Sequence, residues 1–368
     1  MSNPIRQHYI PKSYLKNFGT KGRKRTFLVD VYRINDKVEL SGVSTSDICV
    51  QKNLYTIHTD EEKKKYALEL FYAENVDSEY PNVYEILINP NIKHITPEQK
   101  YKILYVCLSL YFRTPTYLNY INRITDEAFD IASKTADVKS SLIKMNLFGE
   151  QLEFHLDELG GYKESYRIKN KKKFHLEHLE QWHKFIQYKY ECNINVIKVE
   201  DKTAPIITCD NPVSIKGFKT TEFIGLFNSE NVITLPLDEN HFLEIHPNRM
   251  SDQSMIINRL EHDKDFVFTT NFITESNADD QLIGKLGSLK KHFAIQEEYN
   301  KEENRSKFVK KAKHRAEELM SLLQLVEKDG FPSVSVTSKL KEMNNDPHYK
   351  NDKQIDSMIK RVKDLGKW

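Results

Sequence analysis

Three polar residues combine the chemistry and the sequence setting of a catalytic site: His8, Arg113 and Asp210. The imidazole of histidine, with an unperturbed pKa of about 6.5, can act as an acid, a base or a metal ligand near neutral pH. Arg113 ends a run of apolar residues, and a guanidinium there can bind a phosphate or a carboxylate through two parallel hydrogen bonds. Asp210 follows a strand-like run, where its carboxylate can project into a cleft and hold a metal ion or a proton.

The same residue types also admit structural interpretations. His8 could bond a buried backbone group while its apolar neighbours fill the core. Asp210 precedes Asn211-Pro212, which is a strong turn signal, so its carboxylate could accept a hydrogen bond from the backbone two residues on. The sequence leaves both interpretations open at each position.

Two further acids, Glu69 and Asp77, lie eight residues apart on one expected helix. That spacing puts them about 80° apart around the helix axis, so both could face one site. Together with Asp210 they are the candidate ligands for a divalent metal, Mg²⁺ or Mn²⁺. Alternatively, Glu69, Glu74 or Asp77 could form a structural ion pair with Arg113, because a buried guanidinium is costly without a partner.

Other motifs with known chemistry are weak or missing. His175 and His178 share a helix face, but their spacing is not that of a zinc protease and no cysteine pair supports a zinc site. The chain contains no Walker loop, no G-x-G-x-x-G and no G-x-S-x-G. These gaps disfavour P-loop phosphotransfer, Rossmann cofactor binding and α/β-hydrolase chemistry.

Composition places the chain among folded globular proteins. Of its 368 residues, 39% are apolar and 29% are charged, with a net charge of only +2. A disordered chain would have fewer apolar residues or a larger net charge. With 12 glycines, 12 prolines and 4 cysteines, the chain is neither collagen-like nor a disulfide scaffold.

The small net charge hides basic ends around an acidic middle. Residues 1–29 carry +7 and residues 300–368 carry +5, which leaves −10 for residues 30–299. Basic ends can bind an anionic partner, and we expect nucleic acid contacts through residues 6–25 and 301–315. The alternative is an ordinary solvated surface with lysine-rich tails.

The sequence also predicts a cytoplasmic location. The longest apolar run, Ile103–Phe112, has about half of the ~20 residues needed to cross a bilayer. The N-terminus has no apolar segment typical of a secretory signal. The four cysteines form no C-x-x-C pair, which is typical of free thiols in a reducing compartment.

Periodicity assigns the first half of the chain to a hairpin and then to helices. Residues 26–34 and 37–43 are expected to pair as strands around Asn35-Asp36. A helix is expected over 62–89, and another begins at Thr96-Pro97 and runs to Arg113. Because this second helix is apolar all round, we expect it at the centre of a helical bundle.

The second half reads as strands followed by helices. Strands are expected near 193–199, 205–209, 232–235 and 241–246, as an antiparallel meander. Beyond them we expect three elements: helices over 250–264 and 275–286, with a strand at 266–270 between them. The C-terminal part is expected to hold a charged helix over 300–328 and a last helix near 352–365.

These elements predict an α+β fold: a central helical bundle with an N-terminal hairpin, a later antiparallel sheet and a helical C-terminal extension. We expect one core domain over residues 1–299 and a charged extension over 300–368. The extension could dock on a protein partner.

The segment Gln7–Phe18 resembles the opening of the bacterial domain-of-unknown-function family 4238, with its His-Tyr-hydrophobic-Pro stretch and its aromatic-Leu-x-x-Phe. Later features agree: Asp47–Cys49 with Leu54-Tyr55, Arg113–Pro115, and Ile206–Val213 followed by Ile233–Leu237. The resemblance covers about residues 5–285. It implies candidate positions rather than a mechanism, and Asp77 stands where relatives tend to carry a glutamate.

Two hypotheses follow. In the first, the protein is a metal-dependent nuclease or phosphodiesterase: His8 is the base or a ligand, Asp210 holds metal or water, and Arg113 clamps the phosphate. The accessory character of such bacterial families adds the hypothesis of an effector role in antiphage defence. In the second, the protein is a non-catalytic module that docks a protein or nucleic acid, and the same residues only hold its N-terminal segment on the core.

Overall fold

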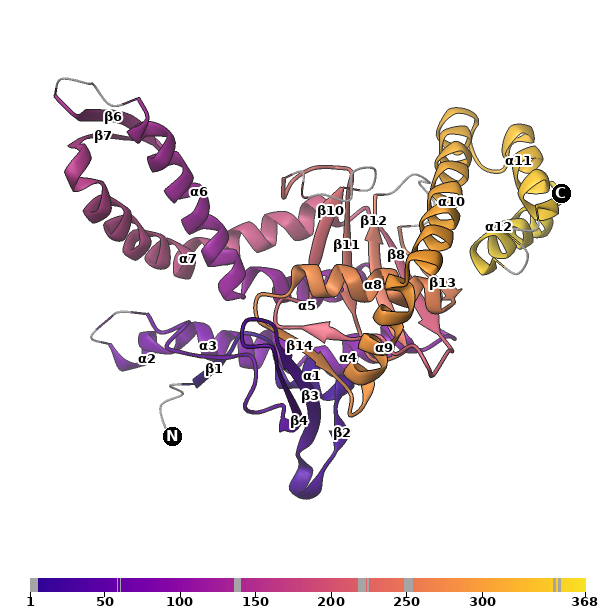
Figure 1. The fold of residues 1–368 in the computed structure, drawn as a ribbon, viewed down its shortest axis with the longest axis horizontal. Coiled ribbons are helices and arrows are strands. Elements are labelled where there is room, and N and C mark those ends of the chain that lie inside the picture. The colour runs from indigo at the N-terminus through magenta and orange to yellow at the C-terminus, as the bar shows by residue number, and fades with distance from the viewer. Residues whose placement is uncertain are drawn as a thin grey trace.

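The computed structural model describes residues 6–57, 59, 61–135, 140–217, 223, 225–247, 254–346, 349 and 352–368. These residues form an α+β fold, as predicted, in which two five-stranded sheets lie among helices. Figure 1 shows the helices α6 and α7 extending to one side of the body and the helices α10 to α12 standing on the other. No described helix is long and apolar enough to cross a membrane.

The N-terminal strap, residues 6–18, consists of β1 (Arg6–His8), α1 (Lys12–Leu15) and a 3-10 turn, Lys16–Phe18. Strand β1 pairs antiparallel with β5 (Val50–Lys52). The apolar side chains Ile10, Tyr14, Leu15 and Phe18 are fully buried, which fixes the strap on the core. The predicted hairpin is confirmed as β3 (Phe27–Arg33) and β4 (Val38–Ser44).

The prediction of a single helix over residues 62–89 is wrong. The chain forms α2 (Glu62–Lys65), α3 (Ala67–Tyr72), a π-helical segment at Ala73–Asp77 and α4 (Tyr80–Ile88). Pro81 explains the last break, because proline fits only the first turn of a helix. The π-helical segment is a feature that recurs at functional sites.

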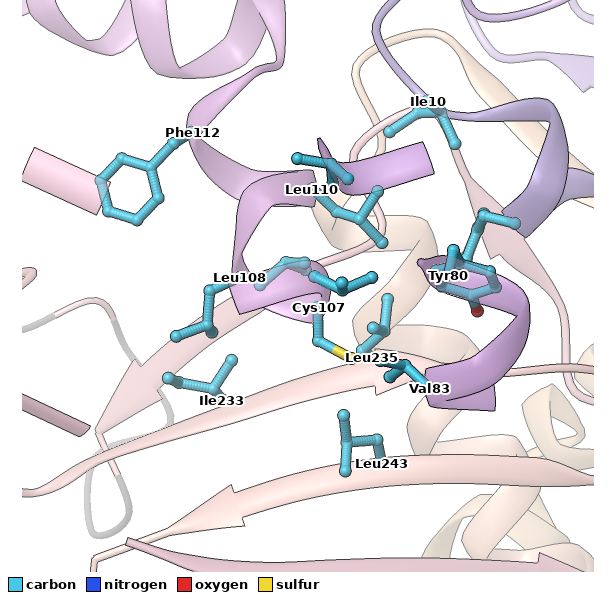
Figure 2. Packing of buried hydrophobic residues seen from close by; sticks show 14 of the residues in the cluster. Ile10, Tyr80, Val83, Cys107, Leu108, Leu110, Phe112, Ile233, Leu235 and Leu243 are labelled. Atoms are coloured by element: carbon cyan, nitrogen blue, oxygen red, sulfur yellow. The ribbon is translucent and has the colours of Figure 1, made fainter. Parts of the chain in front are cut away.

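Helix α5 (Pro97–Phe112) is confirmed and lies in the core, as predicted. Thr96 and Gln99 form a capping box at its start. Figure 2 shows its side chains Cys107, Leu108 and Leu110 between the strap, α4 and the strands that carry Ile233, Leu235 and Leu243. The centre of the protein is therefore a helix packed on a sheet as well as on other helices.

The next segment forms an arm that the sequence did not reveal in full. Helices α6 (Pro115–Ser133) and α7 (Leu159–Lys189) are joined by a hairpin of β6 (Leu142–Leu147) and β7 (Glu150–His155). The outer part of the arm has its own apolar cluster around Phe129, Phe154 and Tyr166. Figure 1 shows this hairpin at the far end of the arm, away from the body.

The first five-stranded sheet has the strand order β10-β11-β12-β8-β13. The strands predicted at 193–199, 232–235 and 241–246 are confirmed there as β8 (Asn193–Val199), β11 (Asn231–Pro236) and β12 (His241–His246), and they pair antiparallel with one another and with β10 (Ser214–Gly217), which was not expected. The strand predicted at 205–209 does not belong to this meander, because Thr208 and Cys209 lie in the second sheet. The expected helix over 250–264 is wrong where it is described: β13 (Ile257–His262) is a strand that pairs parallel with β8. Residues 250–253 of that expected helix lie outside the described residues.

The two following assignments are also wrong. The expected strand 266–270 lies inside α8 (Lys264–Asn277), and the expected helix 275–286 contains β14 (Gln281–Gly284). Asp263 caps α8 through its side chain, and Val267, Thr270 and Thr274 bury one helical face. Strand β14 joins the second sheet, in the order β2-β3-β14-β9, where β2 is Thr20–Lys21 and β9 is Thr208–Cys209.

After β14 the described residues form the helices α9 (Ser288–Asn300), α10 (Glu302–Asp329), α11 (Val334–Asn345) and α12 (Lys353–Asp364). The long charged helix and the last helix are confirmed, whereas α9 and α11 were not expected. Helices α10 to α12 share an apolar cluster of their own that includes Leu322, Leu340 and Ile359. The division at residue 299 stays a prediction.

Candidate functional site

An open cleft of about 590 Å³ lies between the N-terminal strap and the segment that runs from α3 into the π-helical turn. Of the described part of the chain, nine residues line it: Arg6, His8, Lys12, Ser13, Ser46, Glu69, Ala73, Asp77 and Ser78. One wall is held by the pairing of β1 with β5, and the other by helical backbone. The cleft therefore brings His8, Glu69 and Asp77 together from two separate parts of the sequence.

His8 ends β1, where it is paired with Val50. Its Nε2 atom is buried and has no hydrogen-bond partner among the described residues. Burial lowers the pKa of His8 to about 4, with further lowering by the positive charge of Lys12 and an opposing hydrogen bond to the backbone of Thr45. The imidazole is therefore neutral at pH 7 and can accept or donate a hydrogen bond in the cleft.

Glu69 faces the same cleft from α3. Its Oε2 atom is buried and, within the described part of the chain, has no hydrogen-bond partner. Burial raises the pKa of Glu69 to about 7; Arg113 opposes this rise and Asp77 adds to it. A carboxyl group with a pKa near 7 exchanges protons at physiological pH, as a general acid or base must.

Arg113 lies behind the cleft, and its side chain is only 1% exposed. Its Nη1 donates to Asp77 Oδ1 at 2.5 Å and its Nη2 donates to the backbone oxygen of His8 at 2.8 Å. The guanidinium also lies over the ring of Tyr72, 4.3 Å from its centroid. Arg113 thus forms the ion pair that was one of the two sequence interpretations, and it joins the two walls of the cleft.

Asp210 is held in a different network. Its carboxylate accepts hydrogen bonds from the backbone amides of Asp279, Asp280 and Gln281 at 2.9, 3.0 and 3.1 Å. Burial raises the pKa of Asp210 to about 6, although these amides favour the charged form. It is not one of the residues that line the cleft. The carboxylate therefore fixes the turn into β14 rather than a turn of its own.

Asp210 lies near Tyr9, the strap residue that follows His8. Burial raises the pKa of Tyr9, and the nearby groups Cys49 and Asp210 raise it further. Of His8, Tyr9 and Asp210, only His8 is among the described residues that line the cleft.

Comparison with known protein families identifies one family that the chain matches. The model of the family DUF4238, described as a protein of unknown function, matches residues 6–288, which is more than half of the chain. The protein belongs to the DUF4238 family. Searches of curated proteins and of solved structures found no match. The matched region contains every described residue that lines the cleft, together with Arg113 and Asp210, and it ends before α10.

The metal hypothesis for this DUF4238 protein stays a prediction. Among the described residues, no three His, Cys, Asp or Glu side chains are grouped so that they could hold a metal ion. Glu69 and Asp77 share the cleft, but Asp210 does not line it. His175 and His178 have separate partners: the Nε2 of His175 lies 2.7 Å from the oxygen of Leu54, and that of His178 lies 2.7 Å from the hydroxyl of Tyr72.

Sequence reasoning missed part of the cleft. Lys12 and Arg6 were noted only as members of a basic segment, and Ser13, Ser46 and Ser78 were not noted at all. Ser13 and Lys12 lie inside the stretch that resembles the family's opening, which is the signal that could have found them. Nothing in the local sequence marks Ser46 or Ser78, because only the fold brings them beside His8.

Proposed function

We propose that the cleft is the active site of a nuclease or phosphodiesterase. The observation that carries the proposal is a pair of titratable groups, His8 and Glu69, whose buried Nε2 and Oε2 atoms lack partners among the described residues and line one cleft with Arg6 and Lys12. Unpartnered buried polar atoms cost free energy, so a ligand that bonds them gains affinity. The two cations supply the charge that a phosphodiester needs.

The environments of the two groups suggest their roles. Glu69 in its ionised form accepts a proton from the attacking water, the bond from phosphorus to the leaving oxygen breaks as the new one forms, and the leaving oxygen takes a proton from solvent. Neutral His8 accepts a hydrogen bond from the same water and orients it. Arg6 and Lys12 take the place of Arg113 as phosphate contacts, because Arg113 is already bonded to Asp77 and His8.

The proposal has a second form, in which a divalent cation, Mg²⁺ or Mn²⁺, takes part in the reaction. Mg²⁺ is commonly held by one or two carboxylates together with substrate phosphates, so a cluster of three protein ligands is not required. Glu69 and Asp77 would hold the ion, and His8 would then accept the proton of the water. Asp210 has no part in this form.

The test is a cleavage panel. The purified protein is incubated with plasmid, single-stranded DNA, tRNA and long RNA, in Mg²⁺, in Mn²⁺ and in EDTA. Under the proposal Glu69→Gln and His8→Gln lose cleavage, by about 10²-fold or more, as expected for general acid–base groups. The matched controls Glu39→Gln and His94→Gln, both exposed and outside the cleft, keep it.

The second candidate function is a non-catalytic docking module. It is favoured by the contacts of Arg113 and Asp210, which tie the strap, the π-helical segment and β14 into the fold. No cleavage by the wild type, together with early melting of Arg113 and Asp210 variants, would decide for this module.

The partners stay proposals as well. Of the two basic segments, residues 6–25 border the cleft through Arg6 and Lys12. In residues 301–315, Lys311 pairs with Asp265 and Arg315 pairs with Asp352. We therefore assign the nucleic acid contact first to the strap, and a protein partner to helices α10 to α12. The antiphage role stays a hypothesis on which no described residue bears.

A further inference from the structure

The lining of the cleft is polar almost throughout. Among the described lining residues Ala73 is the one apolar member, and the others are charged, hydroxyl-bearing or imidazole side chains. Pockets for aromatic ligands are lined mainly by apolar and aromatic side chains, and sites that bind unpaired bases stack them on aromatic rings. Tyr55 and Tyr72 are the aromatic residues closest to Arg113, but both are buried behind it.

We infer that the cleft binds a phosphorylated sugar unit, the sugar–phosphate backbone of a nucleic acid strand, and leaves the base outside. The inference rests on the proposed function and names the part of the substrate that the site contacts. It makes recognition independent of base identity, because none of the described lining residues offers a stacking surface or a set of groups that surrounds a base edge.

The polar groups match this ligand in kind. Arg6 and Lys12 neutralise a phosphate, and a lysine acts there as a point charge that needs no fixed geometry. The Oγ of Ser13 is buried without a partner among the described residues, as are Nε2 of His8 and Oε2 of Glu69. Inside a strand the free sugar hydroxyl is the 2′-hydroxyl of a ribose, which donates one hydrogen bond and accepts others, so it can satisfy such mixed donors and acceptors together.

The volume fits the same interpretation. About 590 Å³ is enough space for a small molecule, and the cleft is open to solvent, so a strand can pass while one unit enters. A base-binding pocket of this size would need apolar walls, whereas the walls here are the strap backbone, the π-helical turn and their polar side chains.

The experiment measures binding without turnover. The full chain, in EDTA, is titrated into a fluorescent single-stranded oligonucleotide, and then into an abasic strand of the same length and charge. We expect the two dissociation constants to agree within about threefold, whereas a stacking site would lose about tenfold or more for each base removed. Weaker binding of the abasic strand by tenfold overturns the inference, and so does the absence of binding by both strands.

Competitors identify the source of the sugar phosphate. Ribose 5-phosphate displaces the strand if the cleft accepts free sugar phosphates, and fails to do so if it needs the continuous backbone; displacement by unphosphorylated nucleosides overturns the inference. Ser13→Ala should weaken both strands equally, while Lys290→Ala, an exposed residue of α9, leaves both unchanged. Circular dichroism melting confirms that each variant is folded.

These outcomes separate the two proposals. If Glu69→Gln keeps the wild-type cleavage rate while the abasic strand binds normally, the proposed catalytic role fails and the backbone-binding inference stands. If Glu69→Gln abolishes cleavage but binding depends on the bases, the catalytic proposal stands and the inference fails.

Discussion

The cleft and the Asp210 turn are two buried polar regions that use their side chains in opposite ways. At the turn, one carboxylate accepts three backbone amides. In the cleft, polar atoms of His8, Glu69 and Ser13 are buried without a partner in the described part of the chain and border open space. Satisfied groups hold a fold together, whereas unsatisfied groups beside a cavity are available to a ligand.

Arg113 resembles the turn in its use, because its two terminal nitrogens donate to Asp77 and to the His8 carbonyl and so place both walls of the cleft. The comparison is useful because it assigns opposite outcomes to substitutions. A substitution at Arg113 or Asp210 should lower the stability of the fold. A substitution in the cleft should lower binding or turnover while the protein stays folded.

The largest effect is expected for Arg113→Ala. It leaves Asp77 and the His8 carbonyl without their partner and opens space beside Tyr72, so we expect a loss of about 3 kcal/mol in the free energy of unfolding. Chemical denaturation measures it. The control Arg33→Ala removes an exposed pair with Asp36 at 3.8 Å and should change stability by less than about 0.5 kcal/mol. Equal losses of stability in both variants would contradict a structural role of Arg113.

The next effect is expected for Asp210→Asn. The amide nitrogen of asparagine is a donor, so at least one of the three backbone amides at Asp279–Gln281 would face it without an acceptor. We expect a loss of about 1–3 kcal/mol, read from denaturant midpoints. Asp364→Asn, an exposed residue of α12, is the control. A stable Asp210→Asn that loses cleavage would instead return Asp210 to the catalytic hypothesis.

The third prediction concerns Glu69→Gln and the dependence of protein stability on pH. Because burial raises the pKa of Glu69 from 4.5 to about 7, the folded state binds its proton more tightly than the unfolded state does. The wild type should therefore lose stability as pH rises from about 4.5 to about 7, and Glu69→Gln should not lose that part. We expect the variant to melt above the wild type at pH 8 and close to it at pH 4, by calorimetry. A variant that melts lower at pH 8 would show that Glu69 is structural.

The smallest effect is expected for Lys12→Ala. Removing one phosphate contact should lower the slope of log affinity against log salt by about 1, and weaken all strand sequences alike. Anisotropy titrations between about 50 and 200 mM salt measure the slope. Lys290→Ala should leave the slope unchanged. An unchanged slope in Lys12→Ala would show that this lysine does not contact the phosphate backbone of the strand.

Local patterns were enough for some elements and misleading for others. The hairpin over 26–43 and helix α5 follow from turn residues, capping and apolar spacing that act within a few residues. Helix α8 was mistaken for a strand because Phe266, Val267 and Phe268 favour strands, yet the segment buries Val267, Thr270 and Thr274 at helical spacing. Strand β13 was mistaken for a helix because its pairing partner β8 lies far away in the sequence.

By itself the sequence determined the α+β class. It also determined which side chains can titrate or bind a metal ion, among them His8, Glu69 and Asp77, because side-chain chemistry is local. Only the tertiary structure decided how Arg113 and Asp210 are used. A guanidinium or a carboxylate binds whichever partner the fold brings to it, and those partners, Asp77 with the His8 carbonyl and the amides of Asp279–Gln281, come from distant segments. Burial, which sets the pKa values in the cleft, also arises only when those segments pack together.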